Sequence, residues 1–280
     1  MTFTEALFKF RFYLLLLIPI LAVMYFDIVS HMIFQWANDE NYSHGFLVPL
    51  ISGFFVYQRW DKLRTAPVDP SNLGLIVVFI GLSQLILGWL GTELFNMRLS
   101  LVVILCGMTL YLFGLRIFKI MALPLLFLIL MIPIPYIIYD AAAFPLKLFV
   151  TNISVTTLKM LGVIVWNEGN IIMFTNTVLE VADACSGLRS IMSLLALAVA
   201  FAFLTQKNNT KRAIIIASAI PIAVITNAMR VIVTGFLAQY WGPQVAQGFF
   251  HDFAGFAVFA VAMVLLLALG GILSIGPRER

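Results

Sequence analysis

The chain has 280 residues, of which 62% are hydrophobic and 11% are charged, and its mean hydropathy is +1.04. A soluble globular domain carries about a quarter charged residues, so the composition excludes that class and indicates a polytopic membrane protein. The formal net charge is +4, but the basic residues lie in short loops between apolar runs, which argues against a nucleic-acid partner. No cleavable signal peptide is evident, because the apolar run after Arg11 lacks a small-residue cleavage site.

About eight apolar stretches approach the roughly 20 residues that a helix needs to cross a bilayer. In chain order they cover residues 12–29, 45–57, 73–90, 99–113, 121–138, 190–205, 213–240 and 253–274. The second and fourth are short unless flanking residues extend them. The sequence therefore predicts an all-α polytopic membrane protein, which we treat as a single domain over residues 1–280.

Loop charges predict the orientation of these helices. With a cytoplasmic N-terminus, most of the 17 Lys and Arg residues fall on the cytoplasmic side. These are Lys9, Arg11, Arg59, Lys62, Arg64, Arg116, Lys119, Lys207, Lys211, Arg212, Arg278 and Arg280. The opposite loops include the acidic residues Asp39, Glu40, Glu93 and Asp140. The asymmetry matches the positive-inside rule and predicts that both termini are cytoplasmic.

Residues 141–183 do not fit the pattern of simple spans. A full span over 141–165 would invert every later loop, so we expect an amphipathic, interfacial or re-entrant helix on the outer face. Residues 165–183 then combine turn-rich and alternating segments, which predicts a small β-hairpin on that face. An irregular outer loop is the alternative.

Three polar residues stand at the predicted outer ends of the last three spans. Cys185 precedes the sixth span, and His251 lies at the start of the eighth. Arg230 lies in the seventh, 18 residues after Arg212, which is about 27 Å of helix rise. Ionisable groups are costly in lipid, so a functional role is the first hypothesis. A thiolate nucleophile, a fixed cation for an oxyanion and an imidazole acid together describe acyl transfer through a thioester.

Each of these residues also has a structural explanation. A lone membrane cysteine is usually a packed hydrophobe, which is how we interpret Cys106. Arg230 could pair with Asp252 between helices, and His251 could cap an interfacial helix. No disulfide between Cys106 and Cys185 is expected, because their predicted depths differ. Only the joint occurrence of the three residues at one depth favours catalysis.

Further polar residues are candidates for substrate binding or support. Arg189 lies four residues after Cys185 on the same helix face, so it competes with Arg230 as the thiolate partner, unless it binds substrate or pairs with Asp183. Asn227 could orient the Arg230 guanidinium or contact the peptide. The supporting set is Arg189, Asn227, Ser186, His44, Glu180 and Asp183.

Some of these supporting residues have a second explanation. Glu180 and Asp183 are also explained as surface charges of the hairpin. For His44 a second catalytic unit with Ser43 is conceivable, but ending a helix and shaping the substrate entrance is favoured. Zinc-ligand spacing and glycine-rich phosphate loops are absent from the sequence, so no metal or organic cofactor is implied.

Three segments resemble the exosortase family, the bacterial membrane branch of the exosortase/archaeosortase group. They are residues 41–50 (NYSHGFLVPL), 180–190 with their Ala-Cys-Ser-Gly-Leu-Arg core, and 221–230 followed by 250–255. The resemblance implies a multi-span cysteine protease or transpeptidase of the bacterial inner membrane, with Cys185 as nucleophile and Arg230 and His251 as its partners. Archaeal relatives can carry an arginine where this chain has His251.

The resemblance also implies the substrates. These would be exported, membrane-anchored proteins whose C-terminal sorting signal combines a Pro-Glu-Pro type motif, a transmembrane helix and a basic tail. We further hypothesise that the hairpin over residues 165–181 offers a strand edge to the extended substrate peptide. Substrate identity, oligomeric state and the accepting nucleophile (water, a lipid amine or a glycan amine) stay open.

The rival hypothesis is a membrane transporter or polysaccharide-export component, in which the intramembrane Arg and His are structural or line a path. A binding scaffold that needs the hairpin but not Cys185 is a third possibility.

Overall fold

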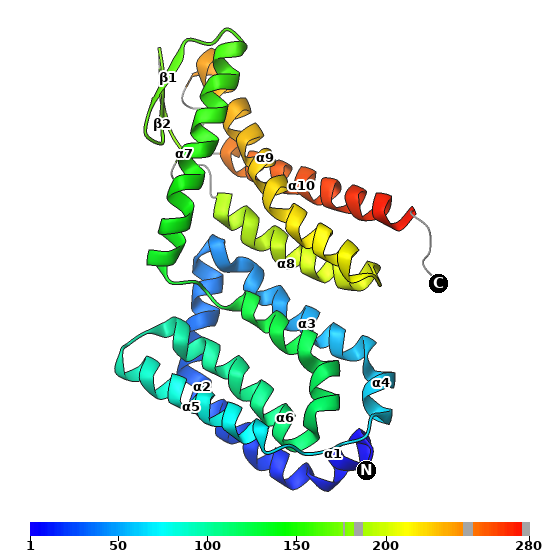
Figure 1. Ribbon diagram of the computed structural model, residues 1–280. Coiled ribbons are helices and arrows are strands. Elements are labelled where there is room, and N and C mark those ends of the chain that lie inside the picture. Colours follow the sequence, from blue (N-terminus) through cyan, green and yellow to red (C-terminus); the bar gives the residue numbers. More distant parts are fainter. Residues whose placement is uncertain (176, 182–186, 243–248, 276–280) are drawn as a thin grey trace. The chain divides into compact units, whose positions relative to one another are not determined.

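The computed structural model describes residues 1–175, 177–181, 187–242 and 249–275, with the backbone alone described at 187–189, 249–252, 254 and 275. Its contacts group the chain into two compact units, Met1–Pro135 (unit 1) and Tyr136–Arg280 (unit 2). Most of the described residues of both units are helical (Figure 1).

Unit 1 consists of helices only. They are α1 (Phe3–Lys9), α2 (Arg11–Asn38), η1 (Glu40–Phe46), α3 (Leu47–Gln58), α4 (Trp60–Thr65), α5 (Leu73–Leu90), α6 (Leu94–Phe127) and η2 (Leu128–Met131). Helix α5 has the predicted bounds, whereas the span predicted at 121–138 is wrong as one helix. Helix η2 ends at Met131 and α7 begins at Tyr136, because Pro133 and Pro135 cannot donate the backbone hydrogen bonds that would continue it.

Helices α5 and α6 pack backbone to backbone through glycines. Gly74, Gly81 and Gly88 recur every seventh residue and are all buried. A Cβ on each would collide with Tyr111, Ile104 and Met97 of α6, respectively. The glycines of α5 and their partners on α6 both recur every seventh residue, but in opposite chain directions. This is expected for two antiparallel helices that stay in contact along their length.

A glycine kink divides α6 at Gly114, where φ is 83° and ψ is 179°. This backbone region is essentially restricted to glycine. The segment before α5 runs against the kink, since the Asp69 N–H donates to the Phe113 carbonyl at 3.2 Å, and a Cβ on Gly114 would overlap the Asp69 carbonyl. The predicted span at 99–113 and the first part of the one at 121–138, up to Phe127, thus belong to one kinked helix.

At the opposite end of unit 1, side chains of α2 and η1 bond to the irregular backbone that follows α6. The Trp36 indole donates to the Met131 carbonyl at 2.9 Å, and the Tyr42 hydroxyl donates to the Ile134 carbonyl at 3.1 Å. Nε2 of His44 lies 3.2 Å from the Leu130 carbonyl. These bonds satisfy carbonyls that no helix pairs, which water would otherwise have to solvate.

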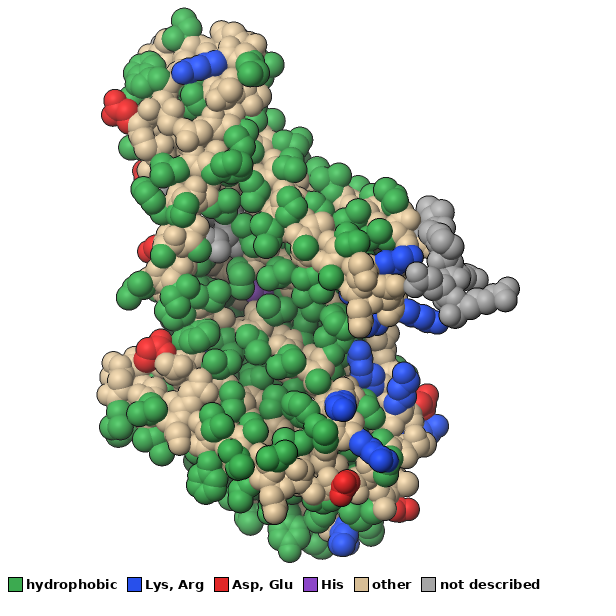
Figure 2. All heavy atoms as spheres, viewed as in Figure 1, with side chains coloured by type: hydrophobic (Ala, Val, Ile, Leu, Met, Phe, Trp, Pro, Cys, Tyr) green, Lys and Arg blue, Asp and Glu red, His purple; other side chains and the backbone are tan. Residues whose placement is uncertain are grey.

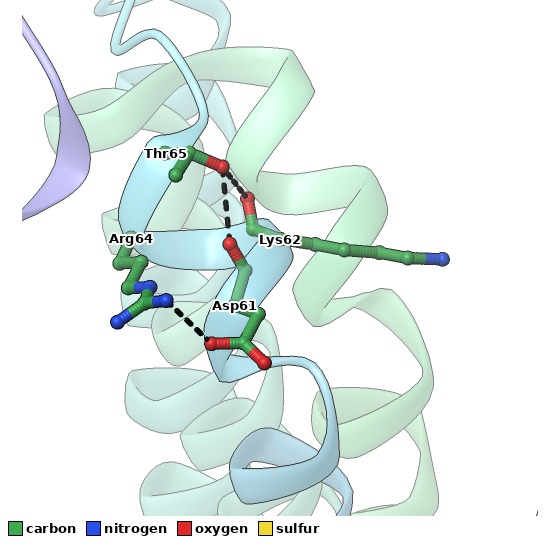
Figure 3. Close-up of polar contacts among 4 residues, drawn as sticks. All are labelled: Asp61, Lys62, Arg64 and Thr65. Atoms are coloured by element: carbon green, nitrogen blue, oxygen red, sulfur yellow. Dashed lines mark hydrogen bonds and ion pairs between the residues drawn. The ribbon is translucent and has the colours of Figure 1, made fainter.

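Basic side chains gather at one end of unit 1. Figure 2 shows Lys and Arg side chains gathered at the end that carries α4. Figure 3 shows the ion pair between Arg64 Nη2 and Asp61 Oδ1 at 3.0 Å there, with the Thr65 hydroxyl donating to the Asp61 carbonyl. Both charged side chains are exposed, so the pair itself contributes little stability. The basic end is better explained as a membrane-surface feature.

Unit 2 contains α7 (Tyr136–Met160), β1 (Val165–Glu168), β2 (Ile171–Phe174), β3 (Val178–Glu180), α8 (Gly187–Thr205), α9 (Asn209–Trp241) and α10 (Phe249–Ile275). Helix α7 is continuous over 25 residues and is long and apolar enough to cross a membrane. Six helices meet that criterion in the described residues, and the helix at Ser190–Thr205 is shorter. The chain is therefore a multi-pass membrane protein, and the predicted count of eight spans is not confirmed.

The predicted hairpin is present and gains a third strand. The sheet order is β1-β2-β3 with antiparallel neighbours. One face is buried against α7 and α9, through a core of Val150, Val155, Leu158, Val163, Val165, Ile172, Phe174, Leu179, Val181, Ala228 and Val231. At the end of β2, the Gln239 amide of α9 donates to the Thr175 hydroxyl at 3.1 Å. The sheet therefore packs beside the C-terminal half of α9.

Helices α8, α9 and α10 form a closely packed bundle (Figure 1). Its buried core is rich in alanine: Leu194, Ala198, Ala202, Ile215, Ala219, Ala223, Ala262 and Leu266. Small residues let membrane helices approach closely. Polar bonds fasten one end, where the Gln206 amide donates to Ser274 at 2.8 Å and Lys211 Nζ donates to the Leu273 carbonyl at 2.7 Å.

Candidate functional site

The end of this bundle opposite Gln206 carries the predicted site. Gly187 starts α8, 18 residues before Thr205, and Asn227 lies 18 residues after Asn209, the first residue of α9. Both separations correspond to about 27 Å of helix rise. Because α8 and α9 are joined by a short turn and pack together, the start of α8 lies level with Asn227 and Arg230.

Arg230 projects from α9 toward α10. A Cβ built on Gly255 of α10 would lie 3.6 Å from Nη2 of Arg230 and 3.8 Å from its Cζ and Nη1. The guanidinium thus lies beside the α10 backbone, where a methyl group at position 255 would make ordinary van der Waals contact with it. The starts of α8 and α10 and the Arg230 guanidinium share one end of the bundle.

An apolar groove of about 350 Å³ runs along α9 and α10 beside Arg230. Its lining is Thr226, Met229, Arg230, Val233, Thr234, Leu237, Phe253, Ala257, Val258 and Val261. Arg230 is the one charged residue among these lining residues. A guanidinium beside apolar side chains interacts more strongly with a developing negative charge than it would in open water.

For Cys185 and His251, the other two predicted catalytic residues, the structure gives only the positions of neighbouring residues or of the backbone. Cys185 lies outside the described residues, two positions before α8 begins at Gly187. His251 lies in the first turn of α10, and its side chain is not described. It precedes Gly255 by four residues, so the helical repeat brings both positions to one face of α10.

The supporting residues are distributed over both units. Asn227 is buried one turn before Arg230, and Glu180 is exposed on β3. Asp183 and Ser186 lie outside the described residues, and Arg189 is placed by its α8 backbone alone. His44 belongs to unit 1, where burial lowers the pKa of its imidazole although the Leu130 and Asn41 carbonyls oppose the shift. That environment holds His44 neutral and suits a structural role.

Two features escaped the sequence analysis. Gly255 of α10 lies beside the Arg230 guanidinium, and Arg98 of unit 1 is a second intramembrane arginine, only 4% exposed. The spacing His251-x-x-x-Gly255 was a usable signal for the first. Among the described residues no group of three His, Cys, Asp or Glu side chains could hold a metal ion, and Cys106 is a free thiol on α6.

Comparison with known proteins gives one family. The model of the transmembrane exosortase family (Exosortase_EpsH) matches residues 36–268, a range that runs through both units. No curated protein and no solved structure matches the chain.

Proposed function

The chain belongs to the transmembrane exosortase family, a family of membrane cysteine peptidase type, and we propose that it is a membrane-embedded cysteine transpeptidase. Its substrates are exported proteins with a C-terminal Pro-Glu-Pro type sorting signal. The chain cleaves that signal through a thioacyl intermediate and transfers or releases the protein at the outer face of the bacterial inner membrane.

The observation that carries the proposal is the setting of Arg230. Its guanidinium lies on an apolar groove against Gly255, level with the start of α8 and one turn from the position of His251. A cation held in that way stabilises an oxyanion without reorganising when the charge develops.

The chemistry assigns one role to each residue. The Cys185 thiolate attacks the scissile carbonyl, and Arg230 stabilises the oxyanion of the tetrahedral intermediate. As the C–N bond breaks, His251 donates a proton to the departing amine, and a thioester remains on sulfur. A second nucleophile, either water or an amine, then attacks the thioester and regenerates the thiol.

The position of Cys185 favours its thiolate form. The positive end of the α8 dipole lies two residues after it, and such an end stabilises negative charge. The Arg230 guanidinium, level with the start of α8, adds a full positive charge at this end of the bundle. Arg189, in the first turn of α8, stays an alternative partner for the sulfur.

The charge distribution supports the proposed orientation. In unit 2, Lys207, Lys211 and Arg212 lie at the fastened end of the bundle, opposite the candidate site. By the positive-inside rule the fastened end is cytoplasmic, which puts the site at the outer face. An apolar groove at that depth suits the start of a substrate's own membrane helix, with the cleavage motif just outside it.

The test is to trap the acyl-enzyme. A tagged reporter with a Pro-Glu-Pro signal, a membrane helix and a basic tail is incubated with the chain, and adducts are located by mass spectrometry. We expect a thioester on Cys185, no processing by Cys185→Ala, and unchanged processing by the matched thiol control Cys106→Ala. Full processing by well-expressed Cys185→Ala would refute the enzyme and favour the transporter or export-component hypothesis.

A further inference from the structure

We propose that the substrate peptide binds as a fourth strand on the β3 edge of the sheet, with the central residue of its Pro-Glu-Pro motif opposite Val178. The inference rests on the proposed function for the identity of the peptide. It specifies which edge of the sheet is used and in which register.

The hydrogen bonds of the sheet show which β3 groups remain available. The Phe174 N–H donates to the Thr177 carbonyl at 2.9 Å, and the Val181 N–H donates to the Asn170 carbonyl at 2.8 Å. Hydrogen-bonded pairs alternate along an antiparallel ladder. The backbone N–H and C=O groups of Leu179 therefore also face β2. Those of Val178 and Glu180 point away from β2, toward the free side of β3.

The opposite edge of the sheet is occupied by α7. The Asn167 amide of β1 donates to the Asn152 side chain of α7 at 3.2 Å, and Val165 of β1 is buried in the core that α7 forms. By the same alternation, Val165 and Asn167 are the β1 residues whose backbone faces outward. Among the described residues, α7 contacts β1 and β2, whereas β3 has its main contacts with β2, so we assign the β3 edge to the further strand.

The Pro-Glu-Pro alternation fits a single strand edge. In an extended chain successive residues direct their backbone polar groups to opposite sides. Two prolines with one residue between them both point the same way, and neither has an N–H to donate. The central Glu then presents its N–H and C=O to β3, while both prolines face away from the sheet, the position that strands tolerate.

Charge selects the register. Val178 and Glu180 are both exposed, with side chains on the sheet face that is not buried against the helices. A substrate Glu directly opposite Glu180 would place like charges side by side, which is destabilising. Opposite Val178 the same Glu meets an apolar side chain, so the peptide is held in one register.

The edge also leads toward the nucleophile. β3 ends at Glu180, five residues before Cys185, and extended chain covers at most about 17 Å in that distance. The sheet packs on Ala228 and Val231 of α9, which flank Arg230 in sequence. A peptide on β3 is therefore held beside the helix turn that carries the guanidinium.

Disulfide scanning tests the edge and the register. The full-length chain carries Cys106→Ala, Cys185→Ala and Val178→Cys, and the probe is a nine-residue peptide centred on Pro-Glu-Pro with one cysteine moved along it. Directly paired residues have Cα atoms about 5.5 Å apart, within disulfide range. We expect cross-linking to peak when the cysteine replaces the central Glu and to alternate every second residue.

The matched control is Trp166→Cys in the same background, because Trp166 is exposed on the same sheet face but lies on β1. It should give only background cross-linking. Uniform yields along the peptide, or equal yields from both positions, would overturn the proposal.

A second pair of variants uses the complete reporter. Val178→Pro removes an outward N–H that the ladder does not use, and should slow processing about fivefold, as for one net hydrogen bond. Val178→Ala loses only side-chain contact and keeps the N–H, so it should process faster than Val178→Pro; equal rates for the two variants would argue against a backbone hydrogen bond at this position. If Cys185 acylates normally but neither the alternation nor the proline effect appears, the strand proposal fails alone. If Cys185 never acylates, the proposed function fails, and the cross-linking pattern still decides the strand.

Discussion

Arg98 in unit 1 and Arg230 in unit 2 are both arginines of candidate membrane-spanning helices, yet their surroundings differ. Arg98 is 4% exposed, and its Nε has no hydrogen-bond partner among the described residues. Arg230 is half-buried and lines a groove of about 350 Å³. A cation in lipid is costly in either place. Both arginines lie in candidate membrane-spanning helices, so this location alone does not identify a catalytic arginine. What distinguishes Arg230 is that a substrate in the groove could reach its guanidinium.

The ends of the two units also differ: both ends of unit 1 are held by hydrogen bonds or close backbone contact, whereas one end of unit 2 carries a groove. Unit 1 is closed at both ends, by the Gly114 kink against Asp69 and by the bonds of Trp36 and Tyr42. In unit 2, polar bonds fasten α8 to α10 at the Gln206 end, while the groove runs beside Arg230 near the other end. We infer that unit 1 is chiefly a scaffold and that the chemistry belongs to unit 2.

Replacing each arginine by methionine should separate the two roles most strongly. Arg230→Met should lower the processing rate about 100- to 1000-fold, the loss typical of one oxyanion-stabilising group, with little change in thermal unfolding. Arg98→Met should keep processing, and stability should be kept or raised, because an apolar side chain of similar size leaves no unpaired buried donor. Reporter cleavage and unfolding in detergent are measured for both.

The opposite results for the two variants would contradict these roles. A folded Arg98→Met chain without activity would give the enclosed arginine a functional role, and normal cleavage by Arg230→Met would remove the proposed oxyanion stabiliser.

Gly114→Ala should be the most damaging small substitution in unit 1. The residue has a positive φ and would push its Cβ into the Asp69 carbonyl, so a loss of about 1–3 kcal/mol or more is expected. Gly53→Ala of α3 is the matched control, since nothing lies within 4 Å of its Cβ position. A helical Gly→Ala change there should raise stability by about 0.5–1 kcal/mol. Equal unfolding midpoints for the two variants would contradict the kink.

The sequence predicted local structure well where one pattern dominated. Hydropathy alone located α5 to its terminal residues, and turn residues with alternation located the sheet. The Pro133 and Pro135 break was missed because the apolar run continues through it. The enclosure of Arg98 depends on contacts between distant helices, which no local pattern encodes.

For the site, the sequence identified residue types and predicted a common depth. Arg230 is described, and the starts of α8 and α10 lie level with it. The assignment of Cys185 and His251 stays a prediction. What local reasoning could not provide is the closeness of the Gly255 position to the Arg230 guanidinium, because the two lie on different helices.

Gly255→Leu tests whether the space at position 255 sets the position of the Arg230 guanidinium. A longer side chain would displace the guanidinium, and we expect the cleavage rate to fall about tenfold, because misplacing a catalytic group by about 1 Å can cost up to a hundredfold. Gly271→Leu on the same helix has open space around its Cβ position and should cleave normally. If both leucine variants behave alike, Gly255 does not position Arg230.

The smallest expected effect concerns His44 in the polar end of unit 1. Burial lowers the pKa of this imidazole, so below the ordinary value of about 6.5 the unfolded chain binds a proton that the folded chain does not. The free energy of unfolding should therefore fall as the pH drops from about 7.5 to 5.5, and His44→Gln should reduce this acid sensitivity while leaving residual processing. His31→Gln, which removes an exposed imidazole of α2, is the matched control and should keep the sensitivity. An unchanged acid slope in His44→Gln would mean that its imidazole is not the group that the closed end of unit 1 holds neutral.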